Sequence, residues 1–162
     1  MKLISSLLLI AVASILNSRQ PSDSVQQSIQ RSKLVMNAYA YAWNTGKLDT
    51  LDSICDTDVV RYDGIAPGYQ YRGLPALKQF ITGYRTMFPD FKMVREEEFY
   101  TGNRAILRWI VSGTNTGPGF IAPTGKSFRL SGISLCRFRE ANLLKTKPRV
   151  MVFFSWNNWV TN

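Results

Sequence analysis

The sequence predicts an α+β domain, in which helices come first and a run of strands follows. Apolar residues recur at helical spacing in three segments before Pro89, with one short strand between the second and the third. Four longer segments after Pro89 have the residue types and lengths of strands. Helices followed by strands are typical of folds in which helices cover one face of an antiparallel sheet. We therefore expect three helices packed on one face of a curved, mostly antiparallel sheet.

The composition bounds the class of protein. The chain of 162 residues, with 45% hydrophobic and 12% aromatic residues, fits a single globular domain with a real core. Its net charge is +9, and ten of its eleven carboxylates lie at or before Glu98, so the C-terminal part is strongly basic. Such a charge either keeps one face solvated or attracts an anionic surface.

Histidine is absent from the sequence, and histidine is both the commonest metal ligand and the most frequent general base near neutral pH. The two cysteines, Cys55 and Cys136, have no metal-ligand spacing. They form either one disulfide, if the protein is exported, or two separate buried thiols. The residues therefore imply no metal and no organic cofactor.

Residues 1–18 are typical of a secretory signal peptide. Lys2 gives the positive start, an uncharged apolar run follows over residues 3–16, and small residues around Ala13 offer cleavage sites. The run is shorter than the ~20 residues that span a bilayer, which favours a cleaved signal over an uncleaved membrane anchor. We expect a secreted or extracytoplasmic protein whose single domain is residues 19–162.

Capping residues and prolines set the expected helices. The first helix begins after the polar residues at Ser22 and ends at Gly46, a residue that commonly terminates helices. A second, short helix covers residues 47–54. The third begins near Pro75 and is stopped by Pro89. The apolar face of the first helix is expected to consist of Val25, Ile29, Met36, Ala40 and Trp43.

Runs of β-branched and aromatic residues between turn residues predict five strands. They cover residues 58–64, 91–100, 104–112, 128–138 and 150–156. Between the first strand and the third helix, residues 64–73 hold three glycines and a proline, which predicts a loop. Three successive acids, Glu96 to Glu98, are expected on a solvated strand edge, where charge resists unwanted pairing.

The most conspicuous stretch is residues 113–126, GTNTGPGFIAPTGK. It holds four glycines and two prolines between two strand-like segments. It is too irregular for a two-residue hairpin turn, so we expect a long connection between neighbouring strands. Binding and catalytic residues often lie on such loops, so residues 113–126 are the first candidates for a functional segment.

Several motifs, in this order, resemble the SnoaL-like polyketide cyclase and ester cyclase group of the nuclear-transport-factor-2-like superfamily. The matching pieces are AWNTGKLDTLDSI, GLPALKQF, FPDFK and, as the strongest, RWIVSGTNTGPGFIAPTGKSF. Together they span roughly residues 25–156. The resemblance implies a cone whose sheet lines a pocket, with the helices on its concave face. It also implies a small apolar or carbonyl-containing ligand and a homodimer formed through the sheet.

The resemblance places six side chains near that pocket: Tyr39, Trp43, Tyr62, Asp63, Trp109 and Asn115. Residues expected to bind substrate are Tyr39, Trp43, Trp109 and, on the third helix, Tyr84. Strand alternation supports part of this set independently, because Trp109 and Asn115 have the same parity and would face the same way on a straight strand.

The chain departs from the family's catalytic pattern. Asn115 and Tyr62 stand where cyclising members often have histidine, and residues 123–129, near which the family's acidic base lies, hold no carboxylate. Asp63 is the expected substitute: a general base whose pKa burial would raise. Asn115 and Tyr62 would then orient or polarise the substrate. The structural alternatives are that Asp63 is a turn residue, that Asn115 bonds its own loop, and that Trp109 belongs to the core.

Two hypotheses of function therefore stand side by side. In the first, the protein transfers a proton on a carbonyl or ester substrate, as in an aldol-type cyclisation. In the second, it is a non-catalytic binding or dimerising module that has lost the family's base. A third, binding to nucleic acid or an anionic surface, is disfavoured because the aromatic–basic motifs of single-strand binders are absent. It would require one contiguous patch formed by Lys126, Arg129, Arg137 and Arg149.

Overall fold

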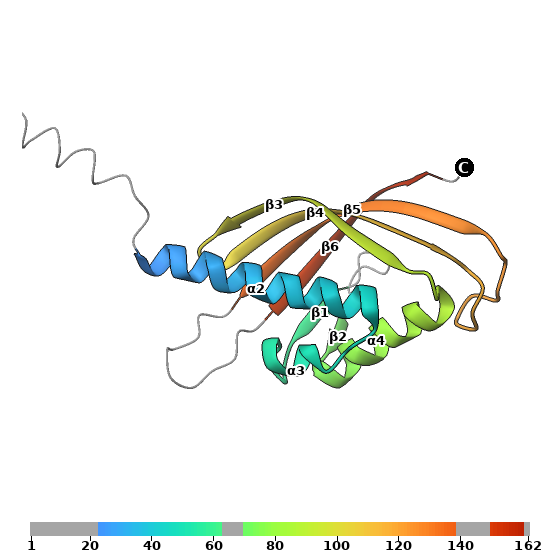
Figure 1. The fold of residues 1–162 in the computed structure, drawn as a ribbon, viewed down its shortest axis with the longest axis horizontal. Coiled ribbons are helices and arrows are strands. Elements are labelled where there is room, and N and C mark those ends of the chain that lie inside the picture. The colour runs from blue at the N-terminus through green and yellow to red at the C-terminus, as the bar shows by residue number, and fades with distance from the viewer. Residues whose placement is uncertain (1–22, 63–69, 139–149, 161–162) are drawn as a thin grey trace, which may run out of the picture.

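The computed structural model describes residues 23–62, 70–138 and, as the path of one strand, 150–160 (Figure 1). The helices in these ranges are α2 (Asp23–Thr45), α3 (Thr50–Ile54) and α4 (Leu74–Met87). The strands are β1 (Val60–Tyr62), β2 (Gln70–Arg72), β3 (Lys92–Thr101), β4 (Arg104–Thr114), β5 (Ser127–Phe138) and β6 (Val150–Val160). The expected signal peptide, Asp63 and Arg149 lie outside the described residues.

One curved sheet carries all of these strands, in the order β2-β1-β6-β5-β4-β3. The pairs are antiparallel except for β1 and β6, which run parallel. Figure 1 shows the helices gathered on one side of the sheet, with α2 running beneath the long strands. The predicted α+β class, with helices on the concave face of a mostly antiparallel sheet, is confirmed.

The long helix α2 supplies the largest part of the helical cover. Its C-terminal half is buried, including Met36, Tyr39 and Trp43, and it ends where Gly46 adopts a left-handed conformation with φ 74°. The predicted face is wrong at its start, because Val25 is exposed and Ile29 only half-buried. Figure 1 shows the reason: the first turns of α2 extend beyond the edge of the sheet.

Two further elements differ from the expectation. The second helix is confined to Thr50–Ile54, because residues 47–49 form a turn that leads into it; its buried anchor is Leu51. The segment expected to be a loop contains the short strand β2, whose residues pair with β1 in an antiparallel register. This pairing gives β1 a hydrogen-bonded neighbour on its outer side. None of the described helices combines the length and the hydropathy needed to cross a membrane.

Alternation along β4 and β5 separates the two faces of the sheet. Side chains of one parity, such as Leu107 and Trp109, are buried under the helices. Those of the other parity face outward. Three of them, with two residues of the neighbouring strand β3, form an exposed apolar group that we call the convex patch. Its members are Val94, Phe99, Ile106, Ile133 and Leu135, with exposures between 43% and 62%.

Strand β3 is an edge strand, as its three acids predict. A bulge between Arg95 and Glu97 leaves Glu96 without a partner residue in the ladder. Arg108 on β4 pairs with both Glu96 and Glu97, each at 3.0 Å. Arg108 is therefore outward-facing, in agreement with its parity.

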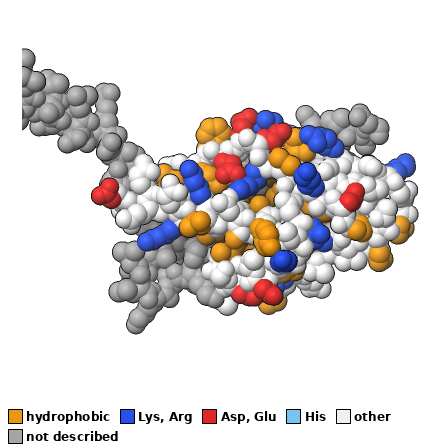
Figure 2. Space-filling view, viewed as in Figure 1, with side chains coloured by type: hydrophobic (Ala, Val, Ile, Leu, Met, Phe, Trp, Pro, Cys, Tyr) orange, Lys and Arg blue, Asp and Glu red, His pale blue; other side chains and the backbone are white. Residues whose placement is uncertain are grey.

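Basic side chains do not form one contiguous patch in the described part of the chain. Arg129 and Arg137 lie at opposite ends of β5, opposite Ser112 and Arg104 on β4. Between them, on the same face, lie Ile133 and other residues without charge. On the face shown in Figure 2, Lys and Arg side chains are interspersed with acidic and apolar ones. The arrangement required for an anionic-surface protein is therefore not supported here.

Candidate functional site

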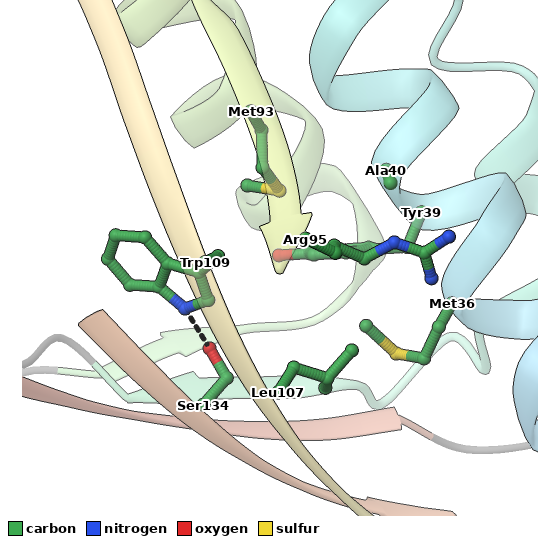
Figure 3. A pocket seen from close by; sticks show the side chains of 8 residues that line it. All are labelled: Met36, Tyr39, Ala40, Met93, Arg95, Leu107, Trp109 and Ser134. Carbon is green, nitrogen blue, oxygen red and sulfur yellow. Dashed lines mark hydrogen bonds between the residues drawn. The ribbon is translucent and has the colours of Figure 1, made fainter. Parts of the chain in front are cut away.

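A small cavity lies between α2 and the concave face of the sheet (Figure 3). Its volume is about 20 Å³, room for a water molecule or a group of that size. Residues from α2 and from strands β3, β4 and β5 line it: Met36, Tyr39, Ala40, Met93, Arg95, Leu107, Trp109 and Ser134. Two of the expected substrate-binding residues, Tyr39 and Trp109, are thus brought to one cavity.

Trp109 forms one wall of the cavity. Its indole Nε1 donates a hydrogen bond to Ser134 Oγ at 2.8 Å, which holds the ring against β5. The ring lies over Gly132, the residue directly opposite it in the β4–β5 ladder. A Cβ atom at Gly132 would collide with the indole ring, so a glycine is required for this close approach.

Tyr39 reaches the cavity from α2 and is almost fully buried. Its hydroxyl oxygen accepts a hydrogen bond from Arg61 Nη1 on β1 at 3.1 Å. Burial raises the pKa of Tyr39, and the nearby Arg61 charge and a contact with Trp43 oppose this effect only in part. The phenol therefore keeps its proton at neutral pH.

Arg61 is a buried cation held among aromatic rings. Its guanidinium carbon lies 4.5 Å from the centroid of the Phe80 ring and 5.5 Å from that of Trp43. Cations are stabilised over such ring faces, most of all where water is excluded. Only 7% of Arg61 is exposed, so its charge acts in a medium of low dielectric constant.

Trp43 and Tyr84 lie outside the lining of the cavity. They belong to an aromatic cluster behind Tyr39, in which the Trp43 ring is 5.9 Å from that of Tyr84 and 5.2 Å from that of Phe91. This cluster joins α2 to α4. The roles predicted for Trp43 and Tyr84 in substrate binding stay predictions.

Tyr62 is described by the structure and its neighbour Asp63 is not. Tyr62 is half-buried at the end of β1, and Asp63 follows it just outside the described residues. Neighbouring Arg61, which has the opposite parity, points into the interior instead. The base role of Asp63 stays a prediction.

Asn115 is buried at the other end of the concave face, where β4 enters the glycine-proline connection. Its side-chain Oδ1 accepts a hydrogen bond from the Thr124 backbone N–H at 2.7 Å, across the loop. Because that partner is a donor, the amide nitrogen Nδ2 must point the other way, and it is buried with no partner among the described residues. The side-chain oxygen of Asn115 therefore bonds its own loop, as the structural alternative predicted. Only Nδ2 is left to donate a hydrogen bond to a ligand.

The glycine-proline connection is fastened at several points. Gly117 donates its backbone N–H to the Met87 carbonyl at the end of α4, and its Cα lies so close to Thr86 that a Cβ atom would collide with the Thr86 carbonyl oxygen. Asp90 accepts hydrogen bonds from the Thr114 backbone at 2.6 Å and from its hydroxyl at 2.8 Å. These two bonds, the side-chain one first, hold the pKa of Asp90 below its usual range.

Both cysteines are free, buried thiols. Burial raises the pKa of Cys55 and of Cys136 to about 12, so both stay protonated at neutral pH. Among the described residues no cluster of three or more Cys, Asp or Glu side chains could hold a metal ion.

Sequence reasoning missed Arg61, Arg95 and Ser134 as residues of this region. Arg61 gave no signal, because a single arginine in a short strand is usually solvent-facing. Arg95 lies just before the bulge and has the same parity as Met93, so alternation could have found it; Figure 3 shows its side chain reaching across to α2. There Nη2 donates to Asn37 Oδ1 at 2.6 Å. Ser134 could have been found, because it has the same strand parity as Gly132 and Cys136.

The curved sheet and the helices that close its concave side, with a small cavity between them, define a cone-shaped α+β domain. The chain belongs to the family of SnoaL-like polyketide cyclases, which it matches over residues 33–146. The predicted family is therefore confirmed. No curated protein matches this chain in sequence.

Three solved structures of similar fold come from bacteria. AclR from Streptomyces galilaeus, a proposed hydroxylase, has a TM-score of 0.62 and 19% identity, with 80% of each chain covered. A proposed SnoaL-like polyketide cyclase from Jannaschia sp. CCS1 has a TM-score of 0.61 and 16% identity over 83% of this chain and 90% of that one. IdmH from Streptomyces antibioticus, a proposed polyketide cyclase, has a TM-score of 0.60 and 22% identity over 77% of this chain and 90% of that one. At these identities the likeness establishes the fold alone.

Proposed function

We propose that this protein is an exported, small-molecule-binding member of the family, whose cavity receives the carbonyl end of an apolar ligand. The observation that carries the proposal is the cavity itself, in which the hydroxyl-bearing Tyr39 meets an otherwise largely apolar wall. Such sites bind through apolar contact and use a few polar groups to fix orientation.

The cavity has to widen for a ligand larger than one small group, and its walls favour that. Met36 on α2 and Met93 on β3 face it from different elements. Methionine is unbranched and adapts its shape at low cost, so rotation of these two side chains would enlarge the space. Leu107 and Trp109, on the central strand β4, form the fixed part of the wall.

Under this proposal the reaction is proton transfer next to the ligand carbonyl. Asp63 removes the proton as general base, Tyr62 orients the substrate, and Asn115 can contribute only as a donor through Nδ2. The alternative is a binding module without a base, which would hold the same ligand and leave its protons in place.

One experiment separates these functions. Cyclohexanone is added in D₂O to protein labelled with ¹³C at the methionine methyl groups. Binding in the cavity shifts the signals of Met36 and Met93, while Met87, which is buried but does not line the cavity, serves as the internal control. Proton NMR of the ketone then reports exchange of its α-hydrogens for deuterium.

Each outcome has a definite meaning. Accelerated exchange that is lost in Asp63→Asn supports the enzyme, and shifts without exchange support the binding module. Unchanged Met36 and Met93 signals at high ketone concentration would contradict both, because the cavity would then not take carbonyl ligands.

The proposal includes a homodimer formed through the convex patch. In the ladder Phe99 is opposite Ile106, and Ile106 is opposite Leu135, so the patch forms an apolar row across three strands. A second copy of the chain would remove this row from water. We expect Leu135→Lys to convert a dimer to a monomer in analytical ultracentrifugation, whereas Arg129→Lys on the same strand leaves the mass unchanged. A wild-type monomer at high concentration would rule the dimer out.

Export is the remaining part of the proposal and rests on residues 1–18. We expect the mature protein from a secreting host to begin after this segment, as measured by mass spectrometry of the intact chain. Recovery of a soluble protein that retains Met1 would argue against a cleaved signal.

A further inference from the structure

We propose that Tyr39 and Arg61 form a pair that recognises the oxygen atom of a carbonyl-containing ligand in the cavity. Tyr39 donates its hydroxyl hydrogen to that oxygen, and Arg61 positions Tyr39 and strengthens it as a donor. The inference rests on the proposed function and names the feature of the ligand that the site selects.

The direction of the hydrogen bond between these residues is fixed by chemistry. A guanidinium has N–H donors and no acceptor, so Arg61 Nη1 donates to the Tyr39 oxygen across the 3.1 Å between them. The hydroxyl hydrogen of Tyr39 must therefore point elsewhere. The structure offers it no acceptor among the described residues, although only 2% of Tyr39 is exposed. A buried donor left unused destabilises the protein, and a ligand oxygen would remove that cost.

The position of Tyr39 directs this donor toward the cavity. Figure 3 shows its side chain reaching from α2 toward Trp109, between Met93 and Leu107. The other hydroxyl of the wall, that of Ser134, already accepts the indole N–H of Trp109. The Ser134 oxygen thus accepts from a neutral donor, whereas the Tyr39 oxygen accepts from a cation, and this difference makes Tyr39 the stronger donor of the two.

Arg61 is suited to the positioning role because it cannot easily move. Its planar group is packed against the Phe80 and Trp43 rings, which fixes the direction in which Nη1 donates to Tyr39. Its positive charge stabilises the negative charge that grows on the Tyr39 oxygen as the hydrogen is shared with a ligand. The raised pKa of Tyr39 is consistent with this role, since a donor must keep its proton.

The test compares two probes of equal shape. Cyclohexanone has a carbonyl oxygen where methylenecyclohexane has a CH₂ group, so the ratio of their dissociation constants isolates the contact to oxygen. Both constants are measured from the methyl shifts of Met36 and Met93. We expect wild-type protein to prefer the ketone by about tenfold, the effect of one buried hydrogen bond, and Tyr39→Phe to abolish that preference.

Matched variants separate the pair from general effects on folding. Tyr100→Phe removes a hydroxyl that bonds Glu98 outside the cavity, and it keeps the preference. Arg61→Met preserves an unbranched stem but loses the donor and the charge, and it lowers the preference toward that of Tyr39→Phe. Arg61→Lys retains the charge without the planar donor and gives an intermediate preference. Destabilisation alone would weaken both probes equally and leave their ratio unchanged.

The outcomes distinguish this inference from the proposed function. If both probes bind and Tyr39→Phe or Arg61→Met keeps the wild-type ratio, the pair is overturned while the ligand site stands. If wild-type protein binds the two probes equally, the pair is likewise overturned. If neither probe shifts Met36 or Met93, the ligand site and the pair are both overturned.

Discussion

The two ends of the concave face use their buried polar groups in opposite ways. At the cavity end, Tyr39 and Ser134 accept hydrogen bonds from side chains of other elements, Arg61 and Trp109. At the loop end, Asn115 Oδ1 accepts its hydrogen bond from the backbone of its own connection, at Thr124. Tyr39 and Ser134 line the cavity, whereas the Asn115 side chain holds the glycine-proline connection in place.

The hydrogen-bond partners of a buried polar residue indicate whether it supports the fold or can bind a ligand. A side chain that satisfies the backbone N–H groups of a tight connection acts as scaffold, because that need exists with or without a ligand. A hydroxyl of a cavity-lining residue, whose oxygen already accepts a hydrogen bond from another side chain, still has its own hydrogen to donate. On this ground the Asn115 side-chain oxygen is assigned to the scaffold, and the Tyr39 hydroxyl to the proposed ligand site.

The largest expected effect is at the cavity end, where Trp109 forms one wall. Trp109→Ala takes away a buried indole and its bond to Ser134, and we expect a loss of about 3–5 kcal/mol in the free energy of unfolding. Trp109→Phe keeps most of the buried area and should lose much less. Urea unfolding measures both. If Trp109→Ala lost less free energy of unfolding than Trp109→Phe, the indole ring would not be packed against Ser134 and Gly132 as described.

The loop end depends on close contact with α4. Gly117→Ala would place a Cβ atom on the Thr86 carbonyl, so the connection must shift, at a cost of about 1–3 kcal/mol. Gly83→Ala is the matched control, because a Cβ there meets open space in a helix and should stabilise by up to about 1 kcal/mol. Thermal unfolding of the two variants should move in opposite directions. Equal shifts would argue against this anchor.

Asn115→Ala probes the scaffold role of the loop amide. We expect a loss of about 1 kcal/mol, because Thr124 loses one acceptor but keeps a second bond to the Asn115 backbone carbonyl at 3.1 Å. Faster amide hydrogen exchange confined to the connection would accompany it. If exchange instead quickened around the cavity, the two ends could not be treated as separate.

The smallest expected effect is the pH dependence from Asp90. Its folded pKa is held below the unfolded value by Thr114, so its stabilisation is present above the unfolded pKa and is lost as pH falls through the folded pKa. Because Asp90 is solvent-exposed, the contribution is below about 1 kcal/mol. Urea unfolding of wild type and Asp90→Asn should therefore differ at pH 7 and converge near pH 2. A constant difference would contradict the assignment.

Much of the fold could be predicted from the sequence because its signals are local. Pro75, Pro89 and Gly46 mark helix ends, and strict alternation along β4 places Leu107 and Trp109 inside. Short elements were harder to predict from local signals. Strand β2 exists because β1 offers it a partner, and three residues carry no periodic pattern of their own.

The site was predictable only in part for a similar reason. Strand parity predicts that Trp109 faces the interior, whereas only the family resemblance places Tyr39 at the pocket. Neither signal indicates Arg61, because its burial depends on rings contributed by α2 and α4, far along the chain in both directions. Arg95 is inward-facing because it has the same strand parity as Met93 and lies opposite Trp109, just before the bulge.

The bulge itself has a consequence for how this edge can change. Arg95 pairs with Trp109 and Glu97 with Arg108, so Glu96 is surplus to the ladder. Deleting Glu96 would leave every other β3 side chain on its present face. What would be lost is an ion pair with Arg108 and the local twist that bends the border of the sheet away from other chains. Deleting Glu96 is thus expected to spare the fold and to make the border of the sheet a more regular template for pairing with another chain.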